Sequence, residues 1–266
     1  MIPTELGELE AFRSLIGGWN GGRVTEVVGA LCTAVPAAAG SALLNRVVGL
    51  GLGEPATEEA LDEIDAFFAD EEVSYGITVT PDVDPPELTA WLEARGFSRG
   101  YAWAKFRRGI ESAPAPETHL TVERIGAERG DVFADVFQRA YGTPELLRPR
   151  LEQMPGETGW YCFVAFADGV PAATAAIFVT GDVGWLGMAG TLPEFRRRGA
   201  QSGLLAARIT AAQEAGCSVV VTETGEPVEG RPSNSYRNIV RTGFEPVYAR
   251  QNYLSSETAD TSGTRA

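Results

Sequence analysis

Histidine, lysine and cysteine are scarce in this chain of 266 residues. His119 is the only histidine and Lys105 the only lysine, and the three cysteines lie apart without CxxC spacing, at Cys32, Cys162 and Cys217. A histidine-based catalytic triad or a histidine-ligated metal site is therefore not expected. The scattered thiols indicate a reducing compartment and argue against a disulfide framework or a zinc site, so we predict no metal.

Long hydrophobic runs are also missing, and so is a basic leader. No apolar stretch reaches the length that crosses a bilayer. The first residues, MIPTELGELEAFRSLIGG, carry acids where an export signal carries bases. We therefore expect a cytoplasmic protein without a membrane partner.

Positive charge is in deficit as well. Lysine and arginine together number 22 against 36 acidic residues, and the formal net charge is −14. Such a surface repels nucleic-acid phosphates, so we expect no nucleic-acid partner. The acidity suits either solubility or a cationic substrate, and composition does not decide between them.

The length allows two domains, and one segment separates them in the sequence. The stretch IESAPAPETH (110–119) is rich in Pro, Ala and Glu and lacks hydrophobic periodicity, which is typical of a semi-rigid linker. We predict a first domain over 1–110, a linker over 111–118, a second domain over 119–254 and a flexible tail over 255–266.

The second half alternates between strand and helix patterns. Asp168-Gly169 and Gly181-Asp182 have the turn chemistry of two hairpins. Thr143 and Pro144 fit the start of a helix, which Pro149 should break or kink. We predict three strands between 160 and 193, further strands over 119–125, 217–224 and 245–254, and helices over 127–142, 143–154, 200–216 and 232–244.

The boundaries of helices and strands are less clear in the first half of the sequence. The segment 22–36 fits either a helix or a strand. RGFSRGYAWAK at the end of the first half is similar to TGFEPVYARQN at the end of the second, which indicates a duplication. We predict helices over 8–17, 56–71 and 85–97, with Thr57 as a helix cap, and strands over 44–52, 73–81 and 99–108.

An arginine cluster runs against the acidic background. Arg196, Arg197 and Arg198 follow a predicted strand and directly precede Gly199, where a helix begins. The first N–H groups of a helix lack internal partners and lie at the positive end of the helix dipole. With arginines beside them, they predict a site for an anion such as a pyrophosphate. Gly199, which has no side chain, would let such a ligand approach the backbone closely.

The sequence around this cluster, TLPEFRRRGAQSGLL, resembles the acetyl-CoA-binding signature of the GNAT superfamily of N-acetyltransferases, Arg/Gln-x-x-Gly-x-Gly/Ala. Arg196 fills the first position and Gly199 the fourth, whereas Gln201 replaces the small sixth residue. Downstream, SNSYRNIVRTGF resembles the last helix of the superfamily. The resemblance implies an α/β fold with a mixed (α+β) sheet, as two GNAT-like domains in tandem, each a central mixed sheet flanked by helices.

The first domain resembles a degenerate copy without a cofactor site. Glu54, Glu58 and Glu59 lie where the second half has its arginines, and they would repel a pyrophosphate.

The resemblance also implies where acetyl-CoA binds as cosubstrate. The pantetheine arm would pair with the backbone of the fourth strand, and the pyrophosphate would lie on the following loop and helix start, flanked by Arg196. Asn238 would hydrogen-bond around its helix or contact the pantetheine. The implied backbone positions are Met188, Ala189, Gly190 and Thr191 for the pantetheine, and Arg197, Arg198, Gly199, Ala200, Gln201 and Ser202 for the pyrophosphate.

Acetyl transfer to an amine needs a proton acceptor for the amine and a proton donor for the leaving thiolate. The superfamily often has a tyrosine where this sequence has Ile239, so Tyr236, on nearly the same helix face, or Ser235 is our candidate donor. Glu223, which follows the strand CSVVV, is our candidate base. Packing alone is the alternative for Tyr236, and an ordinary strand-end acid is the alternative for Glu223.

We therefore predict an acetyl-CoA-dependent N-acetyltransferase, an acyltransferase that acts on a small-molecule amine by direct transfer. A non-catalytic acyl-CoA sensor or partner-binding module is one alternative, which Ile239 favours. A protein-lysine acetyltransferase is the weaker one. A homodimer is left open, and the sequence does not identify the acceptor.

Overall fold

The computed structural model describes residues 2–228 and 233–255. The described chain divides into two compact units that are not consecutive segments. Unit 1 consists of residues 2–105, 224–228 and 247–255, and unit 2 consists of residues 106–223 and 233–246. The predicted tail lies outside the described residues except for Ser255, and the predicted domain limits remain a prediction.

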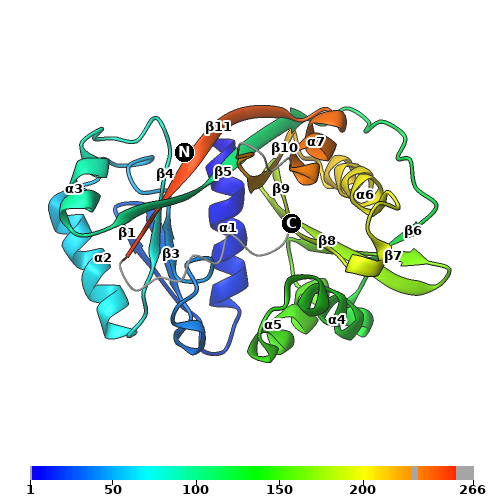
Figure 1. The fold of residues 1–266 in the computed structure, drawn as a ribbon, viewed down its shortest axis with the longest axis horizontal. Helices are drawn as coiled ribbons and strands as arrows, with labels where there is room; N and C mark the ends of the chain where they lie inside the picture. The colour runs from blue at the N-terminus through cyan, green and yellow to red at the C-terminus, as the bar shows by residue number, and fades with distance from the viewer. Residues whose placement is uncertain (1, 229–232, 256–266) are drawn as a thin grey trace. The chain divides into compact units, whose positions relative to one another are not determined.

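Unit 1 is a mixed sheet with helices packed on it (Figure 1). Its strands lie in the order β1-β2-β3-β4-β11-β5, and β3 and β4 run parallel. The elements are α1 (Pro3–Gly17), β1 (Arg23–Val27), β2 (Ala30–Ala34), η1 (Pro36–Ala38), β3 (Arg46–Val48), α2 (Glu58–Asp70), β4 (Gly76–Val79), α3 (Leu88–Ala94), β5 (Ser98–Gly109) and β11 (Glu245–Leu254).

The segment 22–36, which the sequence left open, forms the hairpin β1–β2. Its strands pair antiparallel from Arg23 with Ala34 to Val27 with Ala30. Val28 and Gly29 make the turn with φ values of 42° and 73°. Two successive positive φ values match the twist of a tight hairpin, so local turn geometry fixes this strand pair.

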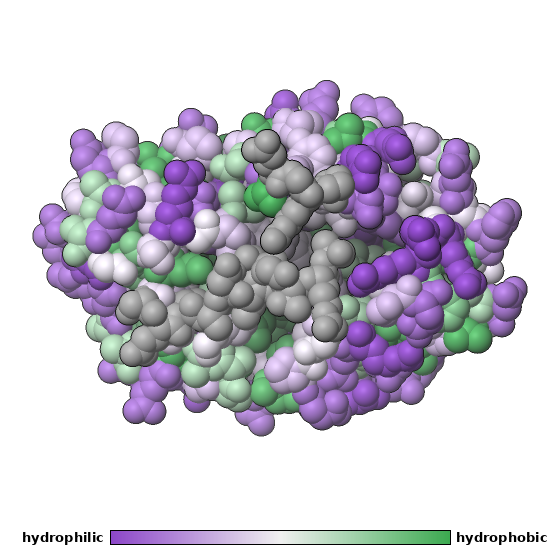
Figure 2. Space-filling model, in the orientation of Figure 1, coloured by the Kyte–Doolittle hydropathy of each residue, from purple (hydrophilic) through white to green (hydrophobic). Residues whose placement is uncertain are grey.

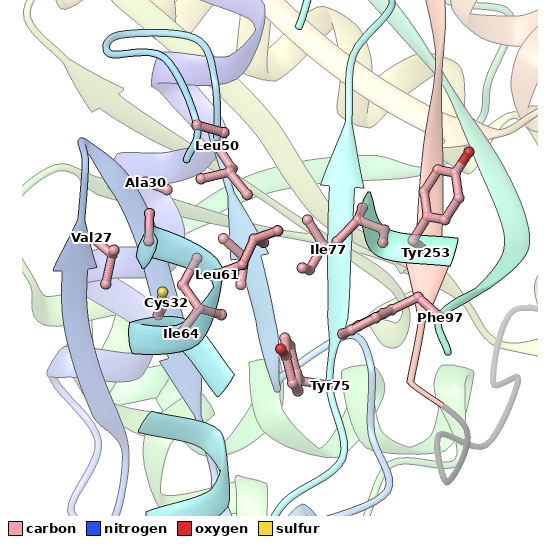
Figure 3. Close-up of a cluster of buried hydrophobic side chains, with 14 of the residues drawn as sticks. Val27, Ala30, Cys32, Leu50, Leu61, Ile64, Tyr75, Ile77, Phe97 and Tyr253 are labelled. Carbon is pink, nitrogen blue, oxygen red and sulfur yellow. The ribbon is translucent and has the colours of Figure 1, made fainter. Parts of the chain in front are cut away.

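The core of unit 1 lies between α2 and the sheet (Figure 3). Leu61 and Ile64 on α2 face Cys32 on β2 and Ile77 on β4. Full burial of a leucine or isoleucine side chain contributes about 1.5–3 kcal/mol. The helix begins at Thr57, whose hydroxyl accepts the Ala60 N–H at 3.1 Å, which confirms the predicted cap.

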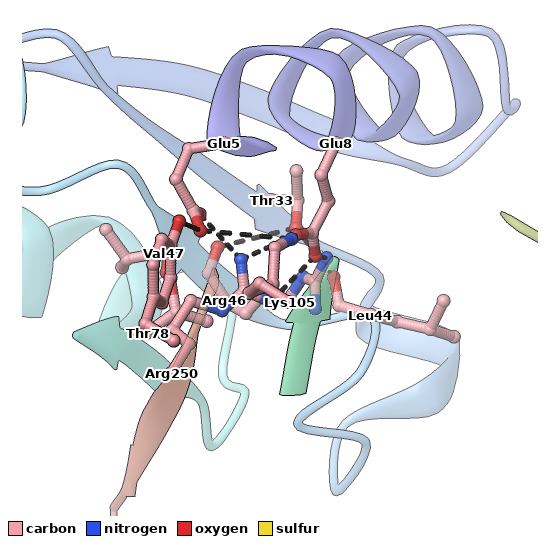
Figure 4. A network of polar contacts seen from close by, with 10 residues as sticks. Glu5, Glu8, Thr33, Leu44, Arg46, Val47, Thr78, Lys105 and Arg250 are labelled. Carbon is pink, nitrogen blue, oxygen red and sulfur yellow. Dashed lines mark hydrogen bonds and ion pairs between the residues drawn. The ribbon is translucent and has the colours of Figure 1, made fainter. Parts of the chain in front are cut away.

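A second buried cluster in unit 1 is ionic (Figure 4). Glu5 and Glu8 on α1 meet Arg46, Lys105 and Arg250 from three strands, and each of the five side chains is at most 2% exposed. The Lys105 ammonium lies 2.6 Å from a Glu8 carboxylate oxygen, and Arg250 Nη1 lies 2.7 Å from Glu5 Oε2. Arg46 donates to the other oxygen of Glu8.

Glu8 is the centre of this cluster. Burial alone raises the pKa of its carboxyl, but the charges of Arg250, Lys105 and Arg46 outweigh burial and hold it well below its ordinary value of 4.5. The carboxylate therefore stays ionised in the folded protein, and α1 is tied to β3, β5 and β11 by charge.

Unit 2 is also a mixed sheet, with strand order β10-β9-β8-β7-β6. Helix α6 packs on one face of these strands, and α4 packs on the other (Figure 1). The elements are β6 (Thr121–Ile125), η2 (Ala127–Arg129), α4 (Gly130–Tyr141), η3 (Glu145–Leu147), α5 (Arg148–Gln153), η4 (Met154–Gly156), β7 (Trp160–Ala167), β8 (Val170–Thr180), β9 (Val183–Thr191), η5 (Pro193–Phe195), α6 (Ala200–Glu214), β10 (Val219–Gly225) and α7 (Asn234–Arg241). The α/β class with mixed sheets and flanking helices is confirmed.

Turn chemistry predicted the hairpins of unit 2 correctly, but one helix prediction was wrong. Asp168, Gly169 and Gly181 have positive φ at the two hairpin turns. The predicted helix over 143–154 begins only at Arg148, and Thr143 caps no helix. Pro149 causes the difference, because a proline fits the first turn of a helix but not its interior.

Within the part of the chain that the structure describes, no helix is long and apolar enough to cross a membrane.

We predict that Glu8→Gln lowers the free energy of unfolding by about 3–5 kcal/mol at pH 7, because it leaves buried cations without their main counter-charge. Urea denaturation measures the change. Glu10→Gln on the same helix is the control. Glu10 pairs with Arg13 at a partly exposed site, so its loss should cost at most about 1 kcal/mol.

The same carboxylate predicts a pH dependence. A depressed folded-state pKa stabilises the protein fully above the unfolded-state pKa, near 4.5, and this stabilisation is lost as the pH falls through the folded-state pKa. The wild type should therefore lose stability below about pH 4.5 more steeply than Glu8→Gln. Parallel stability–pH curves for the two proteins would contradict the assignment.

Candidate functional site

The candidate site of unit 2 begins where two parallel strands part. β9 and β10 pair from Val183 with Val219 to Leu186 with Thr222. β9 then continues to Thr191 without further pairing to β10 in the described register. Backbone N–H and C=O groups need partners, so this edge of β9 over 187–191 is available to an extended ligand. The predicted pantetheine positions, Met188 to Thr191, lie in this stretch.

The other edge of β9 is irregular at the same place. The register between β8 and β9 shifts between Thr174 and Ala176, opposite Gly187 and Gly190. Met188 has a φ of 54°, which is uncommon for a residue other than glycine. Such bulges and outliers gather next to functional sites, where they re-aim the backbone.

Side chains fill the space beside both glycines of the bulge. A Cβ at Gly187 would lie 2.0 Å from Trp185 Cη2, and one at Gly190 would lie 2.8 Å from Tyr141 Cε2. Only glycine lets these rings approach the strand so closely. The aromatic cover therefore depends on the glycines.

Two polar side chains at the bulge were missed by sequence reasoning. The Tyr141 hydroxyl donates to the Ala189 carbonyl oxygen at 2.5 Å, and Arg208 Nη1 donates to the carbonyl oxygens of Ala176 and Gly187, each at 3.3 Å. Loss of hydration raises the pKa of the Tyr141 phenol, and the positive charge of Arg208 opposes this rise. The one sequence signal was an arginine amid the apolar residues of the helix 200–216.

After Thr191 the chain makes a 3₁₀ turn and enters the arginine loop. Arg196, Arg197 and Arg198 are all exposed, and Figure 2 shows strongly hydrophilic side chains gathered over the start of α6. Arg197 has a φ of 64°, a second outlier of the kind found at ligand-binding backbone. The loop thus presents cations beside the positive end of a helix dipole.

The N-terminus of α6 has no side-chain cap. The first hydrogen bond of the helix runs from the Gly203 N–H to Gly199 O at 3.1 Å, so the N–H groups of Ala200, Gln201 and Ser202 have no partner inside the helix. Uncapped N–H groups beside arginines can accept an anion, as the sequence predicts for this loop. Its counterpart in unit 1, α2, is capped by Thr57 and has exposed acids instead.

Asn238 connects the last helix to this site. Its side-chain amide donates to Gln201 Oε1 at 2.7 Å, so α7 is held to the first turn of α6. Gln201, which departs from the small residue of the GNAT signature, therefore has a structural partner.

Gly199 has a different role from the one we inferred. The sequence indicated that it lets a ligand approach the backbone, but its own chain occupies that space. A Cβ at Gly199 would lie 2.1 Å from Glu117 O, and the Thr118 hydroxyl donates to Arg198 O at 3.0 Å. The glycine, at φ 79°, therefore lets the segment 117–118 brace the arginine loop.

The three candidate catalytic residues lie on β10 and α7. Glu223 is half-buried near the end of β10. Tyr236 is half-buried and packs edge-to-face on Phe106, with ring centroids 4.9 Å apart, and Ser235 lies in the same turn of α7. Ile239 is buried, so the usual donor position belongs to the core here. The catalytic roles of these residues stay predictions.

Among the described residues, no group of His, Cys, Asp or Glu side chains could hold a metal ion.

Comparisons with known proteins agree with this geometry. Residues 131–230 match the model of the acetyltransferase (GNAT) family. The chain shares its fold with a GCN5-related N-acetyltransferase from Kribbella flavida, at 19% identity and a TM-score of 0.66, with 96% of each chain covered. No curated protein matches the sequence.

Two further solved structures share the fold. A GCN5-related N-acetyltransferase from Sphaerobacter thermophilus is 14% identical with a TM-score of 0.62, and the match covers 97% of both chains. A tandem GNAT protein from the clavulanic acid biosynthesis pathway is 16% identical with a TM-score of 0.61, and the match covers 90% of this chain and 84% of that one. These likenesses extend over both units of the chain.

We predict that Gly199→Ala destabilises the protein more than Gly216→Ala, which lies at the other end of α6. Both glycines have positive φ, and alanine there costs about 1–2 kcal/mol. Only Gly199 also faces a backbone oxygen, which adds ~1–3 kcal/mol. Urea denaturation measures both variants, and equal losses would mean that Glu117 does not brace the loop.

Proposed function

Because residues 131–230 match the model of the acetyltransferase (GNAT) family, we propose that this protein transfers the acetyl group of acetyl-CoA to the amine of a small molecule. One observation carries the proposal: the unpaired edge of β9 leads directly into the arginine loop and the uncapped start of α6. An extended arm that ends in a pyrophosphate matches both parts of this surface.

In this proposal the chain holds acetyl-CoA by its backbone and its arginines. The pantetheine amides pair with β9 over 188–191, and the pyrophosphate accepts hydrogen bonds from the N–H groups of Ala200, Gln201 and Ser202. Arg196, Arg197 and Arg198 add charge-assisted contacts. Unit 1 binds no CoA, because the start of α2 is capped and acidic.

The reaction is a direct transfer. The amine nitrogen attacks the thioester carbon, the carbonyl electron pair moves to oxygen, and collapse of this intermediate expels the CoA thiolate. Glu223 accepts the amine proton, directly or through water, and Tyr236 or Ser235 donates a proton to the thiolate. The net charge of −14 is compatible with a cationic amine as the acceptor but does not select one.

We predict that replacing Arg196, Arg197 and Arg198 together by alanine weakens CoA binding about 100-fold, at about 1 kcal/mol for each lost contact. Calorimetry measures the dissociation constant. Pantetheine, which lacks the pyrophosphate, is the matched control ligand and should bind both proteins equally. Unchanged CoA affinity in the folded variant would place the pyrophosphate elsewhere.

We predict that Tyr236→Phe and Glu223→Gln each lower kcat by ~10²–10⁴ while CoA affinity stays nearly constant, because each removes a positioned acid or base. The assay is release of CoA thiol with an acceptor found by a mass-spectrometric screen of amines. Ser235→Ala tests the alternative donor. Near-normal kcat in all three variants would mean that the protons move through solvent or through other residues.

The same screen separates catalysis from sensing. An enzyme releases CoA thiol with at least one amine, whereas an acyl-CoA sensor binds acetyl-CoA and turns over none.

A further inference from the structure

Arg208 is a buried cation that lacks a counter-charge among the described residues. It lies on the inner face of α6 and is 2% exposed. Its three hydrogen bonds go to backbone oxygens: Nε donates to Leu204 O at 3.0 Å, and Nη1 donates to Ala176 O and Gly187 O. Arg150, a similarly buried arginine of unit 2, is instead paired with Glu157.

This arrangement is costly for stability. A buried charge without an ionic partner loses its hydration and gains only hydrogen bonds to neutral acceptors. Burial lowers the pKa of the guanidinium to about 9, so it still carries its charge at neutral pH. An apolar side chain would fill the same space without this cost, which favours a functional reason for the charge.

The guanidinium lies at the bulge, where it bridges carbonyl oxygens of the two neighbouring strands. Ala176 and Gly187 are register partners on β8 and β9, and both carbonyl oxygens accept from the same nitrogen, Nη1. Arg208 thereby holds the Gly187 carbonyl toward β8. In a trans peptide the C=O and N–H groups point in opposite directions, so the Met188 N–H points toward the opposite edge of β9.

That opposite edge is the one that β10 leaves unpaired beyond Leu186. The Tyr141 hydroxyl donates to the carbonyl of Ala189, which follows Met188. Side chains therefore hold the backbone on both sides of Met188. A cation at the oxygen end of a peptide also polarises it and makes its N–H a stronger donor. The Met188 N–H is therefore both aimed and strengthened.

We propose that Arg208 is a positioning residue for acyl transfer, which orients and polarises the Gly187–Met188 peptide so that the Met188 N–H donates to the thioester oxygen of acetyl-CoA. This inference rests on the proposed function. As the amine attacks, the carbonyl electron pair moves to that oxygen, and the N–H stabilises the negative charge until the thiolate leaves. Arg208 keeps its proton throughout and acts only through the peptide.

The experiment is infrared difference spectroscopy of acetyl-CoA labelled with ¹³C at the thioester carbonyl, bound to the wild type and to three variants. Arg208→Met removes the charge and the donors at similar length, and Arg208→Lys keeps a charge and a donor. Arg129→Met is the matched control, because it removes a surface cation that is paired with Glu123. None of these measurements needs a known acceptor.

The wild type and Arg129→Met should shift the bound carbonyl stretch to lower wavenumber than in free acetyl-CoA. Arg208→Met should lose most of this shift and Arg208→Lys should restore part of it, while calorimetry gives CoA affinities within about threefold of the wild type. Once an acceptor is known, kcat of Arg208→Met should fall at least ~10-fold, and KM should change little. The loss should be smaller than the ~10²–10³ that removal of an oxyanion donor costs, because Arg208 acts only through the peptide.

Two results would overturn the role of Arg208. One is a carbonyl stretch in the wild type that equals that of free acetyl-CoA, and the other is a full shift in folded Arg208→Met. If Arg208→Met does not fold, the test compares Arg208→Lys with the wild type. A carbonyl stretch that is not shifted in either protein would overturn the inference. Failure of the wild type to bind acetyl-CoA overturns the proposed function, and this inference with it.

Discussion

Backbone pairing between β9 and β10 stops at Leu186 and Thr222, although β9 continues to Thr191. A strand whose edge is left open inside a folded unit must find other hydrogen-bond partners, which water, a side chain or a ligand can supply. Within this stretch of β9, the Tyr141 hydroxyl donates to Ala189 O. The open edge, the bulge behind it and the helix start that follows it form one continuous run of polar backbone, and the proposed binding of acetyl-CoA depends on that continuity.

The two units use charge in opposite ways. In unit 1, Glu5 and Glu8 pair directly with the three cations around them, and α1 is fixed to the sheet by a cluster that has no exposed group to offer a ligand. In unit 2, Arg196 to Arg198 are exposed, and Arg208 is buried without a carboxylate partner in the described chain. Charges that are paired with an opposite charge stabilise the fold. Charges without such a partner are available to bind a ligand or to act in catalysis.

Local signals predicted most of the elements, and non-local contacts account for what was missed. Turn residues such as Asp168-Gly169 fixed the hairpins, and Thr57 fixed the start of α2, because each depends on a few neighbouring residues. Residues 251–254 of β11, by contrast, pair with β4, and no local pattern in the sequence encodes that distant partner. No local signal indicates that the Glu117 oxygen occupies the space beside Gly199, because Glu117 belongs to a segment about 80 residues away in the chain.

The candidate site shows the same limit. The arginine loop could be found from sequence, because an anion site at a helix start needs only adjacent residues. Arg208 and Tyr141 could not, because their roles follow from which carbonyls of β8 and β9 the bulge turns toward them. Ile239 was visible as a departure from the superfamily, and its burial explains the departure: this helix face has joined the core, where a phenol would be cut off from water. In the proposed reaction the proton for the thiolate therefore comes from a group that is still partly solvated, and on α7 Tyr236 and Ser235 meet that condition.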